Sequence, residues 1–147
     1  MSDLGIRPGG LYSGESIPVI EAVLSYANQR HAVLLNNVAN VDTPGFRAKD
    51  LPEEAFRQAL EHAIENRETD ARPLEFASSQ HARRTGDGGF KVVPVQNGSG
   101  VMRNDGNTVS LDEEMTKLLK NGLTVQVFNR LLAGKFQALA TAIRGRV

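Results

Sequence analysis

The chain has 147 residues, and its 17 Lys and Arg balance its 17 Asp and Glu, so the formal net charge is zero. Proteins that bind through phosphates usually carry a basic excess or a basic stripe, so this composition argues against nucleic acid as a partner. The absence of cysteine excludes disulfides and thiolate metal ligands.

The N-terminal stretch MSDLGIRPGG lacks the cationic segment and the following apolar segment of a cleaved secretory signal. The apolar runs of the chain are much shorter than the roughly 18 residues that span a bilayer. We therefore predict no direct membrane insertion, and any export from the cytoplasm is expected to proceed without a cleaved signal peptide.

Residues 16–41 are predicted to form a long amphipathic helix. Ser16 can cap its first turn, and Pro18 is tolerated there because the missing N–H has no partner within the helix. A row of mostly apolar residues alternates steps of four and three, the heptad pattern of helices that pack along one seam. This row consists of Ile20, Leu24, Ala27, His31, Leu34, Val38 and Val41.

A turn follows this helix in the stretch LLNNVANVDTPGF. Pro44 pushes Thr43 out of the helical region, and Thr43–Phe46 fits a type II turn with Gly45 at the position of positive φ. Two interpretations remain open: a capped helix with a solvated turn, or a rigid joint whose amides and aromatic ring contact neighbouring subunits. The second interpretation predicts interface residues at Asn36, Asn37, Asn40, Thr43, Pro44, Gly45 and Phe46.

The middle of the chain, residues 50–103, is predicted to be less regular. A short amphipathic helix is expected from residues 50–53 to about Glu68, with Phe56, Leu60 and Ile64 on its apolar face. Short strands are expected at residues 90–95, and at 100–103 paired with 108–109. The sequence NDGN at 104–107 is predicted to be the turn of this small β-hairpin, because its Asp-Gly pair suits positive φ.

Residues 110–143 are predicted to form the second long helix. The run SLDE from Ser110 is typical of a capping box, with acidic groups at the positive end of the helix dipole. The seam again steps four and three, through Leu111, Met115, Leu118, Gly122, Val125, Asn129, Leu132, Phe136, Leu139 and Ile143. Gly122 either lets a neighbouring backbone come close or marks a kink, and Asn129 either fixes the register of packed helices or points at water. The candidate interface residues of this helix are Leu118, Gly122, Val125, Asn129, Leu132, Phe136 and Leu139.

These elements predict a mainly α fold in which the two long helices pair as an antiparallel, coiled-coil-like hairpin. Residues 1–49 and 104–147 would form one discontinuous helical domain, and 50–103 a variable, partly irregular insert. A two-helix pair leaves its outer flanks uncovered, and contiguous exposed apolar surface usually marks an interface. We therefore expect a subunit of an assembly.

The chain shows no pattern of an enzyme. The glycines at 86, 88 and 89 are not followed by the Lys-Ser/Thr of a phosphate loop, and an EF-hand alignment places Val101 and Arg103 at ligand positions. The histidines, His31, His62 and His81, lack the spacing of a zinc site. We predict no catalytic residue, no metal and no cofactor.

Two motifs resemble those of a known family. LLNNVANVDTPGFRAKD, Leu34–Asp50, is similar to the signature of bacterial flagellar rod and hook proteins, with Val38 in place of an isoleucine and Phe46 in place of a tyrosine. DGNTVSLDEEM, Asp105–Met115, resembles a motif of the FlgB family of proximal rod proteins, with Ser110 in place of an aspartate, and the stretch Arg130–Gly145 is similar to that family's C-terminus.

This resemblance implies a structural subunit of the proximal rod in the periplasm, exported through the flagellar type III apparatus. Its terminal helices would form the inner layer around the export channel, and the polymer would transmit motor torque as a drive shaft. The implied partners are other rod proteins, further copies of the chain, and the adaptor protein between MS ring and export gate at the rod base. The alternative is a cytoplasmic coiled-coil export chaperone or adaptor.

Overall fold

The computed structural model describes residues 16–67, 74–76, 82–84, 90–96 and 102–145. Within these ranges it contains three helices, α1 (Ser16–Ala39), α2 (Glu53–Glu65) and α3 (Leu111–Ile143). The strands are short: β1 (Lys49–Asp50), β2 (Ala82–Arg84), β3 (Phe90–Val92) and β4 (Val95–Gln96). The mainly helical class and the two long terminal helices are therefore confirmed.

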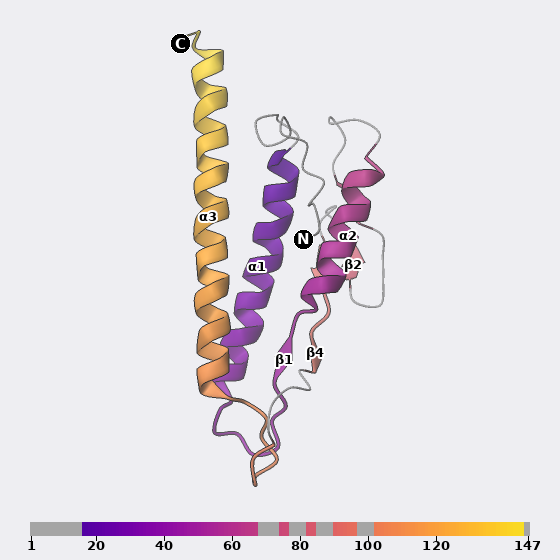
Figure 1. Ribbon diagram of the computed structural model, residues 1–147, viewed down its shortest axis with the longest axis vertical. Coiled ribbons are helices and arrows are strands. Elements are labelled where there is room, and N and C mark those ends of the chain that lie inside the picture. Colours follow the sequence, from indigo (N-terminus) through magenta and orange to yellow (C-terminus); the bar gives the residue numbers. More distant parts are fainter. Residues whose placement is uncertain (1–15, 68–73, 77–81, 85–89, 97–101, 146–147) are drawn as a thin grey trace, which may run out of the picture.

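Helices α1 and α3 lie side by side and run in opposite directions, while α2 lies on the other side of α1 (Figure 1). Two hydrogen bonds fix this antiparallel register. The Asn37 side chain near the end of α1 binds Glu114 in the first turn of α3, and Asn121, two turns on, binds the carbonyl of Ala27.

The boundaries of the long helices agree closely with the prediction, but the predicted cap does not. Ser110 has the extended backbone of an N-cap residue, and its carbonyl accepts the N–H of Glu114 at 2.9 Å. Its side chain makes no capping hydrogen bond, so the predicted capping box is wrong within this described segment. The acidic first turn, Asp112 to Glu114, still lies at the positive end of the dipole.

The predicted β-hairpin around residues 104–107 is also wrong. A turn forms there, with Gly106 at φ +77°, but neither 102–103 nor 108–109 is a strand. The backbone of this segment instead binds the loop after α1, where the N–H of Thr108 donates to the carbonyl of Phe46. Residues 100 and 101 lie outside the described part of the chain.

The four described strands form two small antiparallel pairs. β2 pairs with β3, and β1 pairs with β4, so the expected strand at 90–95 is divided between two partners. The division falls at Val93 and Pro94, where proline has no N–H to donate to a ladder. α2 ends at Glu65, ahead of the predicted Glu68, which lies outside the described residues.

The main hydrophobic cluster lies between α1 and the 50–92 part of the chain. Tyr26 stacks on Phe56 with ring centroids 4.2 Å apart, and Phe90 lies 5.4 Å from Phe56 and 4.4 Å from Phe76. The buried members are Ala22, Tyr26, Leu51, Phe56, Ala63, Leu74, Phe76, Phe90 and Val92. This cluster attaches the middle of the chain to α1; the predicted domain boundary at residue 50 stays a prediction.

Two amide side chains of α1 bind strand backbones in the way a neighbouring strand would. Gln29 donates to the carbonyl of Phe90 at 3.1 Å and accepts the N–H of Val92 at 2.9 Å. Asn37 donates to the carbonyl of Lys49 at 2.6 Å and accepts its N–H at 3.1 Å. α1 therefore holds α3 on one side and both strand pairs on the other.

Candidate subunit interface

The turn after α1 forms as predicted. The N–H of Phe46 donates to the carbonyl of Thr43 at 3.3 Å, and Gly45 has φ +71°. Glycine reaches this conformation without the cost that a Cβ imposes, which explains the Pro-Gly pair. The turn is thus a defined structure and not merely the end of a helix.

This turn is interlocked with the segment that leads into α3. The N–H of Gly45 donates to the carbonyl of Asp105 at 2.9 Å, and the N–H of Ala48 donates to the Thr108 hydroxyl at 3.0 Å. A Cβ on Gly106 would lie 3.5 Å from the Cα of Gly45. The two sequence motifs, some sixty residues apart, form one joint at the end of the hairpin.

Asn107 is the centre of this joint. Its side chain is fully buried, and its Nδ2 donates to the carbonyls of Asn40, Val41 and Thr43 at 2.9–3.0 Å. Its Oδ1 accepts the N–H of Val109 at 2.7 Å. One amide therefore ties together three backbone carbonyls of the loop that follows α1. The Asp-Gly pair beside Asn107 predicts the turn, but no local sequence signal indicates this role of Asn107.

The predicted interface residues around the joint divide into two groups. Asn37 is buried inside the chain, bound to Lys49 and Glu114, and so belongs to the fold of the single subunit. The side chain of Asn40 turns back to the carbonyl of Asn36. Asn36, Thr43, Pro44 and Gly45 are exposed, and Asn40 and Phe46 are partly exposed.

The face of α3 that meets α1 is rotated by about one residue from the predicted seam. Its buried residues are Glu114 and Asn121, and its partly buried ones include Phe128 and Lys135 at the same seven-residue spacing. The predicted row had Met115, Gly122, Asn129 and Phe136 at these places, and all four are exposed. Leu118, Val125 and Leu132, which flank both rows, are partly buried as expected.

Gly122 and Asn129 do not take part in the packing of α3 on α1, and their place in a subunit interface stays a prediction. A Cβ on Gly122 would meet nothing within 4 Å, so α1 makes no close approach there. The register is instead fixed by Asn121, which donates to the carbonyl of Ala27 at 2.8 Å. The periodicity alone could not choose between adjacent rows, because the residues that turn inward are polar.

Glu114 connects this seam to a charged network. Its carboxylate is almost fully buried and accepts hydrogen bonds from Asn37 at 2.8 Å and Lys117 at 2.9 Å. Arg30 forms a two-armed ion pair with Asp50 at 2.9 and 3.0 Å. Burial by itself would lower the pKa of Arg30, but the hydrogen bond and charge of Asp50 outweigh it and raise the pKa. Arg30 therefore stays charged at neutral pH, and its ion pair with Asp50 ties β1 to α1.

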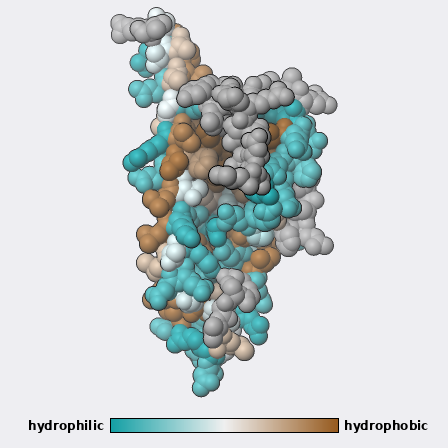
Figure 2. All heavy atoms as spheres, in the orientation of Figure 1, coloured by the Kyte–Doolittle hydropathy of each residue, from teal (hydrophilic) through white to brown (hydrophobic). Residues whose placement is uncertain are grey.

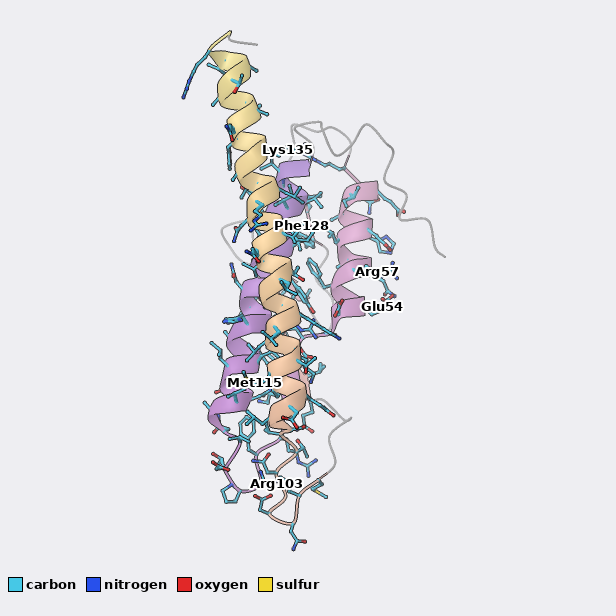
Figure 3. All side chains as sticks on the ribbon, turned by 60° about the vertical axis from the view of Figure 1, so that its left-hand side comes forward. Glu54, Arg57, Arg103, Met115, Phe128 and Lys135 are labelled. Atoms are coloured by element: carbon cyan, nitrogen blue, oxygen red, sulfur yellow. The ribbon has the colours of Figure 1, made fainter. Side chains whose placement is uncertain are left out.

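With polar groups turned inward, large apolar side chains of α3 face outward. They form a row with a strict four-residue spacing and exposed fractions between 45% and 68%. This row, called the α3 row below, consists of Leu111, Met115, Leu119, Leu123, Val127 and Leu131. Figure 2 shows the hydrophobic surface along α3, and Met115 is labelled on the helix in Figure 3. Covering each half-exposed side chain would contribute about 1 kcal/mol to association.

α3 also continues beyond the first described turn of α1. Lys135 lies beside that end of α1 in Figure 3, and the helix continues for two further turns to Ile143. Phe136, Leu139 and Ile143 are 53%, 45% and 85% exposed. Two of the predicted interface residues, Phe136 and Leu139, thus lie on a part of α3 that projects past α1.

Metal-ligating side chains do not gather anywhere in the described part of the chain. No group of three or more His, Cys, Asp or Glu among them could hold a metal ion. His31 and His62 are exposed, and His81 lies outside the described part. No helix that the structure describes is long and apolar enough to cross a membrane.

Comparisons with known proteins gave several relatives that are described as flagellar basal body rod protein FlgB. No family model matches the chain. The flagellar basal body rod protein FlgB of Bacillus subtilis is 31% identical over 135 residues, which cover 92% of this chain and 97% of that protein. FlgB of Aeromonas hydrophila is 34% identical over 83% of this chain and 87% of its own length. FlgB of Aquifex aeolicus is 28% identical over 84% and 88%, respectively.

Proposed function

Since the chain belongs to the FlgB family of flagellar basal body rod proteins, we propose that it is a structural subunit of the proximal rod that polymerises through α1 and α3. The observation that carries this proposal is the α3 row, whose six large apolar side chains are exposed and wind across the outward half of α3 by about 40° per four-residue step. Contiguous apolar surface of this kind is typical of a face that another protein covers.

The joint supports a mechanical role for the subunit. Asn107 and the paired turns close the end of the hairpin with hydrogen bonds from buried or partly buried groups. Asn37 and Asn121 fix how α3 lies against α1. A subunit with a fixed joint and register can pass torque to its neighbours through packed side chains without any catalytic step.

The location and partners follow from the proposed role. The chain would be exported by the flagellar type III apparatus without a cleaved signal, and would assemble in the periplasm around the export channel as part of the drive shaft. Its neighbours would be other copies, other rod proteins, and the adaptor between MS ring and export gate at the rod base.

Complementation of a strain that lacks the gene tests this function. The double variant Leu119→Asn/Leu123→Asn changes two exposed side chains of the α3 row and should leave the monomer folded. We expect it to be exported but to restore neither rods in isolated basal bodies nor swimming. The control Ile64→Asn replaces an exposed apolar residue on α2, at 45% against 68% and 62% for Leu119 and Leu123, and should swim like the wild type.

The other outcomes separate the alternatives. Normal swimming of the double variant would contradict polymerisation through α3. Recovery of the wild-type chain only from the cytoplasm, with no copies in basal bodies, would favour the export chaperone or adaptor.

A further inference from the structure

α1 also has an uncovered face, and it is lined mainly by small residues. Its residues alternate steps of four and three along the helix, and all are exposed. This face, called the α1 stripe below, consists of Glu21, Ser25, Asn28, Ala32, Leu35 and Ala39. It is separate from the residues of α1 that are buried against α3 and against the middle of the chain, such as Ala27 and Tyr26.

We propose that the middle of the α3 row of one copy, at Leu119 and Leu123, packs against the α1 stripe of a second copy. This inference rests on the proposed function and adds to it the pair of faces that meet. The row supplies large side chains and the stripe supplies small ones, so the ridge of one helix can enter the groove of the other at a short interaxial distance. Gly122, exposed between Leu118, Leu119 and Leu123, adds a hollow to the row for a side chain of the partner, such as Asn28.

Charge favours this pairing over a contact between two α3 helices. From Met115 to Ile143, α3 contains four basic residues and no acidic one. Two α3 rows facing each other would bring Lys120 and Arg130 of both copies together, which is repulsive. The α1 stripe instead has one charged member, the acidic Glu21.

The axial positions of these charges also agree. The bond from Asn121 to Ala27 shows which parts of the helices lie at one level. Arg130 is nine residues beyond Asn121, and Glu21 is six residues before Ala27, which at 1.5 Å per residue is about 14 and 9 Å along the axes. In two copies side by side at the same height, Arg130 can therefore reach Glu21. The same alignment places Leu119 beside Asn28.

The proposed contact uses two different faces, so it does not close on itself. Each copy keeps one α3 row and one α1 stripe available for further copies. A heterologous contact of this kind generates a ring or an open helical filament. The pairing therefore gives a route from one subunit to a tube of alternating α1 and α3 helices.

Disulfide cross-linking tests the pairing directly, because the natural chain has no cysteine. Leu119→Cys with one tag is co-expressed with Asn28→Cys or Ala32→Cys carrying a second tag, in flagellated cells lacking the natural gene. Facing cysteines form a disulfide when their Cα atoms are within about 7 Å. We expect isolated basal bodies to give a dimer band that contains both tags, and the pair that cross-links best gives the axial offset. Gln58→Cys, exposed on α2, replaces the stripe cysteine in the control and should leave only monomers.

The results distinguish this inference from the proposed function. If the chains are present in basal bodies and the cells swim, but Leu119→Cys cross-links mainly to itself or equally to Gln58→Cys, the pairing of faces is overturned and the rod function stands. If even the wild-type chain is absent from basal bodies, the proposed function fails, and the pairing fails with it.

Discussion

Asn107 offers the most direct test of the joint. The change Asn107→Asp keeps the size of the side chain and the acceptor for Val109, but replaces the Nδ2 donor by an oxygen that faces three carbonyl oxygens at 2.9–3.0 Å. Two N–H donors are lost at about 1 kcal/mol each, and an acceptor left buried without a donor costs about 1–3 kcal/mol more. We therefore expect the free energy of unfolding to fall by about 3–5 kcal/mol.

Urea unfolding followed by far-ultraviolet circular dichroism measures this loss. Asn104→Asp is the matched control, because Asn104 lies in the same turn and is exposed. The surrounding carbonyls should raise the pKa of the introduced carboxyl at position 107, so the variant should regain part of its stability as the pH falls and the carboxyl becomes a donor. If both variants unfold within about 0.5 kcal/mol of each other at neutral pH, the reasoning about the joint is refuted.

Three further predictions follow from single residues. Gly45 has φ +71°, so Gly45→Ala should lower the free energy of unfolding by about 1 kcal/mol. Gly122 lies on open helix surface, so Gly122→Ala should raise it by about 1 kcal/mol. Urea unfolding measures both changes, and changes of the same sign would contradict this prediction. Burial raises the pKa of Tyr26 to about 12. Because the folded pKa of Tyr26 lies above the unfolded value near 10, the contribution of its neutral hydroxyl to the free energy of unfolding is complete below pH 10 and is lost between pH 10 and 12. Absorbance titration at 295 nm, compared with Tyr26→Phe, should show the ionisation of Tyr26 in this range. Ionisation of Tyr26 near pH 10 would contradict the prediction. Asn121→Ala removes the donor to the carbonyl of Ala27 and should cost about 1–2 kcal/mol, while Asn129→Ala should change the unfolding midpoint little; a similar effect of both would mean that the seam is misplaced.

The parts of the fold that the sequence predicted well rest on strong local signals. Pro44 and Gly45 fix the end of α1, and Pro18 and the acidic residues after Ser110 mark helix starts to within a residue or two. Heptad spacing identified the two long helices. It did not identify which side of α3 faces α1, because adjacent rows of the helix differ by one residue and the buried one contains Glu114 and Asn121.

The joint shows the other limit of local reasoning. The sequence NDGN does form a turn, closed by backbone bonds from Arg103 to Gly106 and Asn107, but Thr108 after it bonds to the loop after α1 and no strand pair follows. That choice depends on a contact between residues some sixty positions apart, which turn chemistry does not encode. Asn107 was overlooked for the same reason, since all three of its carbonyl partners belong to the other motif.

The division of polar and apolar residues on α3 has a physical consequence for assembly. Buried polar contacts contribute little net stability, but they penalise every wrong register, because a shifted Asn121 or Glu114 would lose its partner in a buried place. They can therefore set how α3 lies on α1 before any neighbour is present. The six side chains of the α3 row remain outside this contact, and covering them would add about 6 kcal/mol to association by the apolar area they expose. A subunit arranged this way keeps its direction and register when alone, and reserves most of its large apolar surface for the next subunit.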